Sequence, residues 1–514
     1  MRRLIAFIPL LILAGCSRAP AVTAGGELLV GEYEGTVAAF RGVPFAEPPV
    51  GELRWRAPQP VATTLERRDA SGFAAACMQT MRILDWYRYM AETFGASAEY
   101  YDDLEVSEDC LYLNVWTRSL NPGARMPVMV WVHGGSNKSG WSYEDNYRGH
   151  VLAKQGVVVV TVAYRHGLFG FFSHPDLATA SPAANFGLWD LVAALRWVQD
   201  NIEAFGGDPD RVTLFGESAG AENILALMMA EPARELFHRA ILQSNAGFGL
   251  PMSDIDEEIA RGEKLASLVG AGSLDELRRM DATRLLDVYT EHFDDHYHSP
   301  AIDHQLIPGP TWGGEFGNHA LMIGTNRDEW LDSIATDVAS EDLARTAAEY
   351  PQIGGTAALS ALADEQDPRR AMDRLTTAAE MVCPSQSLAA RRTASGGEAW
   401  VYWFTRQRED PAGEKLGAYH GAEYPYVFGV HDDYMTTTDD DRRLSALMQR
   451  YWVNFATTGD PNSSELPEWP LFERPDPLIM DLGDRVEAIP AIEPELCAAF
   501  ERWLEGPGAA TPRK

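Results

Sequence analysis

The sequence has 514 residues, of which 46% are hydrophobic, and it contains 14 Trp, 18 Tyr and 20 Phe. That length and apolar content allow a large buried core, which excludes a disordered or low-complexity protein. With 43 basic and 75 acidic residues, the formal net charge is −32. Such a surface repels phosphate backbones and weakens adsorption to anionic lipid headgroups, so we expect no nucleic-acid partner.

The N-terminus has the pattern of an export signal. Arg2 and Arg3 precede an apolar run at 4–13. This run is too short to span a hydrocarbon layer of about 30 Å as a helix, but it fits the apolar region of a secretory signal peptide. The stretch 13–16 then resembles a bacterial lipobox, which implies cleavage before Cys16 and acylation of its thiol.

These features predict the organisation of the chain. We expect a signal peptide over residues 1–15 and a flexible, lipidated tether over 16–26. No Pro/Gly/Ser linker or internal repeat interrupts the chain after that, so residues 27–505 are predicted to form a single domain, with a disordered tail at 506–514. The lipid would anchor an exported protein to the bacterial outer membrane. An ordinary signal peptide, giving a periplasmic or secreted protein, is the alternative.

Four cysteines remain when Cys16 is set aside: Cys77, Cys110, Cys383 and Cys497. An even number in an exported chain suggests two disulfides with three possible pairings, of which Cys77–Cys110 is the local one. Four buried free thiols are the alternative. No CxxC or Cys/His spacing indicates structural zinc, and we expect no metal site.

Short β-rich runs alternate with helical stretches along most of the chain. Residues 127–133 and 157–164 are nearly continuous apolar runs, typical of strands buried on both faces of a mainly parallel sheet. Apolar residues at helical spacing predict a helix over 188–205. Further strands are predicted at 211–215, 320–325 and 400–404. This alternation indicates an α/β fold.

A GxSxG motif follows one of these strands. Gly216-Glu217-Ser218-Ala219-Gly220 lies between the strand at 211–215 and a helix-forming stretch at 221–229. In this context the turn is so sharp that only small residues fit two positions on either side of the serine. The hydroxyl is held above the sheet at a helix N-terminus, so Ser218 is the candidate nucleophile.

A serine hydroxyl needs a base, and the base needs an orienting acid. His420 lies in a Gly-rich loop beyond the strand at 400–404 and is the candidate base. Glu329 follows the strand at 320–325 and is the candidate acid, with its neighbour Asp328 as the close alternative.

A glycine pair at the end of the strand at 127–133 is a candidate oxyanion hole. The loop His133-Gly134-Gly135-Ser136 offers backbone N–H groups, which stabilise negative charge that develops on a substrate oxygen. A Gly-Gly turn without catalytic meaning is the alternative.

Longer motifs surround these candidate residues. They are Arg41-Gly42-Val43-Pro44-Phe45-Ala46, Ser107-Glu108-Asp109-Cys110-Leu111-Tyr112-Leu113-Asn114-Val115, Phe205-Gly206-Gly207-Asp208-Pro209 and Phe237-His238-Arg239-Ala240-Ile241-Leu242-Gln243-Ser244. Together with the GxSxG motif they resemble a type B carboxylesterase of the cholinesterase/carboxylesterase family, over roughly residues 30–470. The resemblance implies an α/β-hydrolase fold, with a large, mainly parallel central sheet and helices on both faces.

The resemblance also implies roles for individual residues. Ser218 matches the family nucleophile and His420 the base, and Glu329 rather than Asp328 matches the acid. Glu217, beside the nucleophile, is the predicted substrate-binding residue.

The same resemblance covers the oxyanion hole and the disulfides. The oxyanion donors would be the N–H groups of Gly135, Ser136 and Ala219. Cys77–Cys110 and Cys383–Cys497 match two family disulfides in placement.

The sequence departs from the family pattern in three places. Ser136 and Asn137 stand where the family usually has a third glycine and an aromatic residue. Trp86 lies at a different offset from the aromatic residue that cholinesterases use for quaternary ammonium. The segment 292–304 is rich in His and Asp without a recognised metal spacing, and we expect it to make the acyl pocket more polar.

The predicted function is carboxylic ester hydrolysis through a Ser-His-Glu triad and an acyl-enzyme intermediate, with a small-molecule ester as substrate and no cofactor. A catalytically silent adhesion or binding member of the fold is one alternative, although such members characteristically lack a triad residue. An amide or carbamate hydrolase is the other, because the same triad serves each reaction and the shape of the pocket decides between them.

Overall fold

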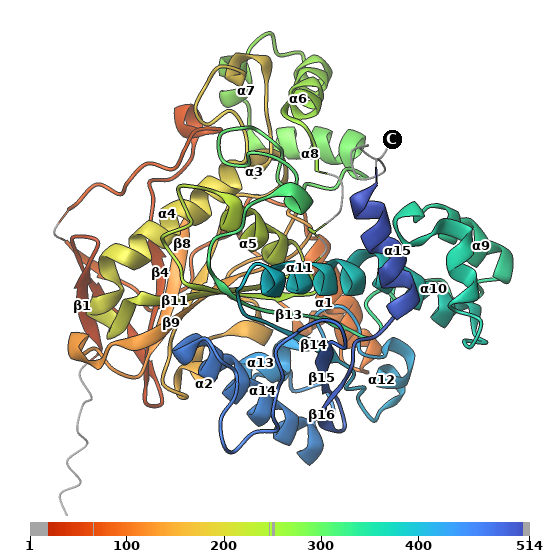
Figure 1. The fold of residues 1–514 in the computed structure, drawn as a ribbon. Coiled ribbons are helices and arrows are strands. Elements are labelled where there is room, and N and C mark those ends of the chain that lie inside the picture. The colour runs from red at the N-terminus through yellow and green to blue at the C-terminus, as the bar shows by residue number, and fades with distance from the viewer. Residues whose placement is uncertain (1–18, 65, 246, 249–251, 507–514) are drawn as a thin grey trace, which may run out of the picture.

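The computed structural model describes residues 19–64, 66–245, 247–248 and 252–506. The predicted signal peptide at 1–15 and the lipidation site Cys16 lie outside the described residues, as does the tail from residue 507. The described residues build one large twisted sheet, which helices cover on both faces (Figure 1).

The central sheet contains eleven strands among the described residues. In spatial order they are β16 (Val486–Pro490), β15 (Leu478–Leu482), β14 (Ala399–Phe404), β13 (Ala320–Asn326), β12 (Arg239–Gln243), β11 (Gly207–Glu217), β9 (Met126–Val132), β10 (Val158–Val162), β8 (Tyr112–Thr117), β4 (Val37–Pro44) and β3 (Glu32–Glu34). The strands from β15 to β10 are parallel, and antiparallel strands complete both edges. The prediction of a mainly parallel sheet is confirmed.

The apolar strands of this sheet are buried on both faces. In β9, Val128, Val130 and Val132 belong to the core on one side, whereas Met129 and Trp131 belong to the core on the other. Successive side chains of a strand point to opposite faces, so a strand covered on both sides needs an unbroken apolar run.

Helices form two layers around the sheet. On one face lie α4 (Phe186–Asn201), α5 (Ala219–Met229) and α11 (Cys383–Ala394), drawn above the sheet in Figure 1. On the other face lie α2 (His150–Ala153), α13 (Tyr424–Phe428) and α14 (Asp439–Thr458). Their apolar sides pack against the sheet and form one core on each of its two faces, which excludes water from the central strands.

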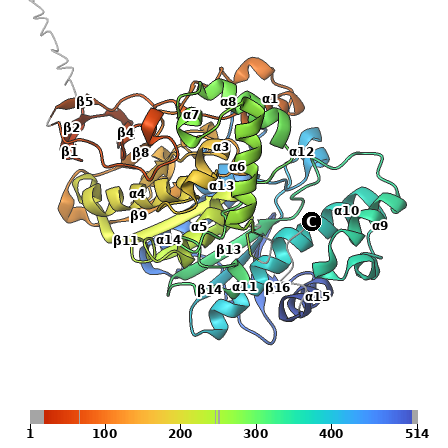
Figure 2. The same cartoon turned by 90° about the horizontal axis from the view of Figure 1, so that it is seen from above.

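The remaining helices lie at the periphery. A separate apolar cluster holds α6 (Ile255–Val269), α7 (Leu274–Arg278) and α8 (Ala282–Phe293) against α3 (Gly167–Gly170). At one end of the molecule α9 (Ser340–Ala348), α10 (Pro368–Thr377) and α15 (Pro494–Glu505) lie together (Figure 2). The last two helices are α1 (Arg82–Thr93) and α12 (Pro411–Leu416).

Two small sheets complete the fold. One of them contains residues that the sequence predicted to be part of a flexible tether. β1 (Ala21–Ala24) pairs with β2 (Glu27–Val30), which also pairs with β5 (Arg67–Asp69). The prediction of a flexible segment over 16–26 is therefore wrong for residues 21–24, because their backbone groups are bonded in a sheet. The other small sheet joins β6 (Ala76–Cys77) and β7 (Val106–Ser107).

Both predicted disulfides are present, Cys77–Cys110 and Cys383–Cys497. The first closes the segment that contains α1, with a sequence separation of 33 residues. The second joins the start of α11 to α15 across 114 residues. Of the helices that the described residues form, none combines the length and the apolar character that crossing a bilayer requires.

Candidate active site

Ser218 lies at the tip of a sharp turn between β11 and α5. Its backbone has φ 53° and ψ −126°, which a non-glycine residue rarely adopts. Such strain persists only where the surrounding structure enforces it, and it is often found at functional sites. The turn predicted from the GxSxG motif is therefore present, with the serine at the N-terminus of a buried helix.

The glycines on either side of Ser218 are required by close contact with β9. A Cβ added to Gly216 would lie 2.6 Å from the carbonyl oxygen of Val132, and one added to Gly220 would lie 2.1 Å from the same oxygen. Both distances are shorter than any van der Waals contact. These two positions thus accept no side chain, which explains their place in the motif.

The predicted oxyanion loop lies directly against this turn. A Cβ on Gly134 would be 3.0 Å from the Cβ of Ser218. Among the described residues, no hydrogen-bond acceptor is bound to the N–H groups of Gly135 and Ser136. The N–H of Ala219 belongs to the first turn of α5, where a helix leaves its N–H groups without an intrahelical partner. The three predicted donors are thus available beside Ser218.

His420 is bound to Glu329 through one ring nitrogen. Its Nδ1 lies 2.6 Å from Oε2 of Glu329. The other carboxylate oxygen of Glu329 accepts hydrogen bonds from the Ser244 hydroxyl, at 2.6 Å, and from the Asn326 N–H, at 2.7 Å. Glu329 is fully buried, so its orientation is fixed by these bonds.

Asp328, the alternative acid, does not face His420. Its Oδ2 accepts a hydrogen bond from the Ala418 N–H at 2.7 Å and lies 2.8 Å from Nη2 of Arg327. Asp328 therefore ties the Gly-rich loop to the end of β13, while its neighbour Glu329 holds the imidazole.

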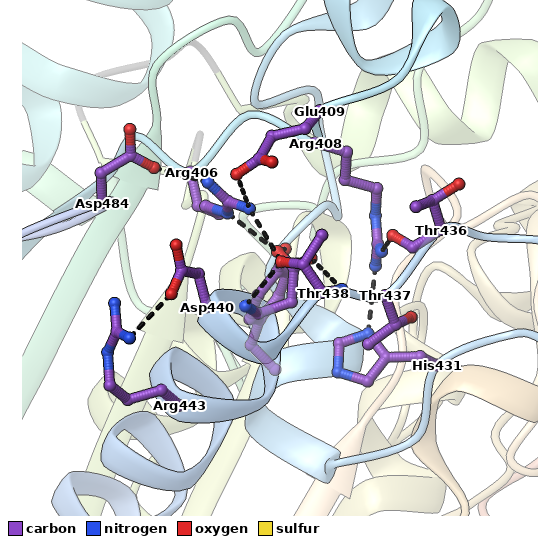
Figure 3. Close-up of polar contacts among 12 residues, drawn as sticks. Arg406, Arg408, Glu409, His431, Thr436, Thr437, Thr438, Asp440, Arg443 and Asp484 are labelled. Atoms are coloured by element: carbon purple, nitrogen blue, oxygen red, sulfur yellow. Dashed lines mark hydrogen bonds and ion pairs between the residues drawn. The ribbon is translucent and has the colours of Figure 1, made fainter.

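The segment that carries His420 is fastened near the end of β14 and at the start of α14 (Figure 3). Arg406 is only 4% exposed, and its guanidinium contacts Asp441 at 2.8 Å and Asp484 at 2.6 Å. Arg408 donates to Nδ1 of His431 at 3.0 Å; burial lowers the pKa of His431 to about 4, so its ring is neutral and accepts. These charge-assisted bonds join the end of β14 to the start of α14 and hold the intervening loop in place.

Glu217 lies on the opposite side of the imidazole from Glu329. Its Oε1 is 3.0 Å from Nε2 of His420, and its Oε2 accepts a hydrogen bond from the hydroxyl of Tyr424. Burial lowers the pKa of His420, but the charges of Glu217 and Glu329 outweigh this effect and hold the pKa of His420 well above its usual range.

Further buried carboxyl groups surround this centre. Glu144 accepts hydrogen bonds from the hydroxyl of Tyr87 and the N–H of Trp141, and burial raises the pKa of Glu144 to about 7. Burial also raises the pKa of Glu423 to about 7, and Glu423 accepts from the side chain of Asn326 at 2.6 Å. The site therefore holds several acidic groups that titrate near neutral pH.

A cavity of about 220 Å³ lies at this centre. The predicted residues that line it are Gly135, Ser136, Glu217, Ser218 and His420. Glu329 lies behind His420 and does not line the cavity. Sequence reasoning did not assign four aromatic side chains that line it: Trp86 and Tyr87 from α1, Tyr424 from α13, and Trp330, whose ring stacks on His420 with the ring centres 5.1 Å apart.

The signal for two missed residues was present in the sequence. Trp330 directly follows Glu329, and Ser244 ends one of the motifs that carry the family resemblance. Trp86 has no such signal, because its offset differs from the family position, yet α1 turns its side chain into the cavity.

The segment 292–304 does not make the predicted polar pocket wall. None of its residues belongs to the described lining of the cavity. His298 is buried behind the oxyanion loop, where burial holds the pKa of its ring well below the usual range. Its backbone oxygen accepts a hydrogen bond from Asn137 at 2.7 Å.

Comparison with known proteins shows which family this chain belongs to. The model of the carboxylesterase family matches residues 22–496, which is nearly the whole chain. The chain belongs to the carboxylesterase family. Carboxylic ester hydrolysis by a serine carboxylesterase is accordingly its activity.

Two curated carboxylesterase relatives cover most of the chain. The para-nitrobenzyl esterase of Bacillus subtilis (strain 168) is 34% identical over 489 residues, which are 90% of this chain and 95% of the relative. The fumonisin B1 esterase of Sphingopyxis macrogoltabida is 34% identical over 481 residues, or 88% and 84% of the two chains.

A solved carboxylesterase structure has the same fold. A structure of a PNB esterase superimposes with a TM-score of 0.80 at 30% identity, covering 93% of this chain and 99% of that one. The α/β-hydrolase fold expected from the sequence is thereby confirmed.

Proposed function

We propose that this carboxylesterase acts through a triad of Ser218, His420 and Glu329 and an acyl-enzyme intermediate. The supporting observation is that Ser218 and His420 line one cavity while Nδ1 of His420 is bound to the buried carboxylate of Glu329. The bond between base and acid is one of the two that the triad of a serine hydrolase needs. The other, from the Ser218 hydroxyl to Nε2 of His420, is part of the proposal, because Nε2 lies 3.0 Å from Oε1 of Glu217 in the structure.

In the first step the neutral imidazole of His420 takes the proton from the Ser218 hydroxyl as its oxygen attacks the ester carbonyl carbon. The oxyanion forms beside the N–H groups of Gly135, Ser136 and Ala219. His420 then protonates the leaving alcohol, and the acyl group stays on Ser218. Water, deprotonated by the same imidazole, attacks the acyl-enzyme and releases the acid. Glu329 stays ionised throughout and fixes the tautomer of the ring.

The test is a panel of esters and amides given to the fragment that lacks residues 1–16, together with a fluorophosphonate probe. We expect hydrolysis of p-nitrophenyl acetate, inactivation by one equivalent of probe, and a mass shift on the peptide that contains Ser218. A silent binding member would not be labelled. Faster cleavage of amides than of matched esters would favour the amidase alternative.

Glu217 should set the pH dependence of this reaction. His420 must be neutral to accept the serine proton, so kcat/KM falls as pH drops below the pKa of His420. The charge of Glu217 raises that pKa. Glu217→Gln removes the charge and should move the acidic limb of the kcat/KM profile for p-nitrophenyl acetate to lower pH.

A matched control is Glu222→Gln. Glu222 is also buried and accepts a hydrogen bond from Tyr297 at 2.8 Å, but it has no contact with His420. The Glu222→Gln variant should leave the acidic limb of the kcat/KM profile at the pH of the unchanged protein. Equal shifts in both variants, or none in Glu217→Gln, would contradict the assigned role of Glu217.

We further propose that the protein is exported as a bacterial lipoprotein, anchored through Cys16 to the outer membrane. The support is the sequence pattern of a basic start, an apolar run and a lipobox-like stretch that ends at Cys16. The first strand of the described residues, β1, begins at Ala21, only a few residues after Cys16 in the sequence. The cavity would then work on small esters near the membrane surface.

Expression of the full chain in a bacterial host tests this anchor. The unchanged chain should incorporate labelled palmitate and sediment with outer membranes. Cys16→Ser should abolish the label and release the esterase activity from that fraction, whereas Cys383→Ser should keep the label. Unlabelled protein in the soluble periplasmic fraction would favour the ordinary signal peptide.

A further inference from the structure

The oxyanion loop has a strained backbone over three consecutive residues. Gly135, Ser136 and Asn137 have φ values of 105°, 59° and 53°. Glycine adopts such angles freely and asparagine tolerates them, but a run of three, with a serine in the middle, costs free energy. Something must therefore hold the loop in this shape.

The side chain of Asn137 supplies that hold. It is fully buried, and each of its polar atoms has partners. Its Oδ1 accepts from Nδ2 of Asn223 at 2.8 Å and from the hydroxyl of Tyr164 at 3.3 Å. Its Nδ2 donates to the backbone oxygen of His298 at 2.7 Å and contacts Oδ1 of Asn223 at 3.3 Å.

Asn223 connects this loop to the nucleophile. It lies on α5, whose N-terminal cap is Ser218 and whose first residue, Ala219, offers the third oxyanion N–H. The loop carries the other two N–H groups. The paired amides of Asn137 and Asn223 thus join the two separate elements from which the oxyanion hole is built.

We propose that Asn137 is a positioning residue that sets the spacing between the two halves of the oxyanion hole. The proposal rests on the proposed function, because it assumes that these N–H groups receive the oxyanion. Donors act only when they lie about 2.7–3.1 Å from the oxyanion, and a misplacement of about 1 Å can cost about 10²-fold in rate. Asn137 and Asn223 are both fully buried, so water does not compete for the bonds that hold the loop against the helix.

The test compares Asn137→Gly with the unchanged protein. Glycine keeps the positive φ without strain, so only the side-chain bonds are lost. We expect kcat for p-nitrophenyl acetate to fall by about tenfold or more, with KM little changed. The affinity for a trifluoromethyl ketone, which forms a tetrahedral adduct with an oxyanion, should fall by the same factor as kcat/KM.

The chain offers a matched control in Asn185. It too has a positive φ, 57°, and is buried, and its amide bonds to the backbone oxygen of Ala301 at 2.8 Å and to Asp303 at 2.9 Å. Asn185→Gly therefore loses a comparable set of bonds away from the oxyanion loop. It should lower the melting temperature but leave kcat per probe-labelled site and the ketone affinity unchanged.

Asn223→Ala removes the same amide pair from the side of α5. It provides the test of the proposal if Asn137→Gly does not fold. It should lower kcat and the ketone affinity in the same direction but by no more than Asn137→Gly, because the bonds from Asn137 to His298 and Tyr164 remain. The double variant should be no worse than Asn137→Gly alone. Unchanged kcat and ketone affinity in Asn137→Gly, or equal losses in Asn185→Gly, would overturn the proposal. Activity that survives Ser218→Ala would instead overturn the proposed triad.

Discussion

Replacement of Ser218 by alanine is expected to lower kcat for p-nitrophenyl acetate by about 10⁴-fold or more. The hydroxyl is the atom that forms the acyl-enzyme, and the strained turn at φ 53° presents it to the cavity. Alanine removes the oxygen and keeps the helix, so folding should be unaffected. The measurement is kcat at saturating substrate, with enzyme concentrated enough to detect the residual rate.

Ser387→Ala serves as the control for loss of a buried hydroxyl. Ser387 lies in α11, and its hydroxyl has no hydrogen-bond partner among the described residues. This variant should keep full activity and full labelling by the fluorophosphonate. If Ser218→Ala hydrolysed the ester as fast as the unchanged protein, the triad mechanism would be wrong.

Glu329→Gln is expected to lower kcat by about 10³- to 10⁴-fold, because a neutral amide no longer fixes the tautomer of His420 or stabilises the imidazolium that forms during attack. The amide has nearly the same shape as the carboxylate and can keep the contacts to Ser244 and Asn326. The loss should therefore appear in kcat, with little change in melting temperature.

Asp328→Asn is the neighbouring comparison. It weakens the tie between Asp328 and Ala418, which holds the loop, but leaves the bond between Glu329 and His420 in place. Its melting temperature should fall more than that of Glu329→Gln, and its kcat should fall far less. If Asp328→Asn lost more kcat than Glu329→Gln, the assignment of Glu329 as the acid would be wrong.

The sequence predicted the central architecture closely, because the strongest signals come from burial. The apolar runs at 127–133 and 157–164 became β9 (Met126–Val132) and β10 (Val158–Val162). A strand buried on both faces is apolar along nearly its whole length, so the apolar run in the sequence marks where the strand begins and ends. The turn at Ser218 was predictable for a related reason, since the contact with β9 excludes side chains at Gly216 and Gly220.

Other features depend on contacts that no local pattern reveals. Asp328 and Glu329 are adjacent and chemically alike, so only the family resemblance and the 2.6 Å contact with His420 separate them. Residues 21–24 have the small side chains of a flexible link, yet pairing with β2 orders them. The walls formed by Trp86, Trp330 and Tyr424 come from three distant segments, and their convergence is a result of folding.

The bond between Cys383 and Cys497 has a consequence for resistance to proteolysis. It encloses the stretch of chain that includes His420. A protease that cuts once anywhere inside this covalent loop leaves the two pieces joined, so the imidazole stays attached to the piece that carries the serine. An esterase that has been cut once in this way keeps both parts of its catalytic centre in one covalently joined molecule.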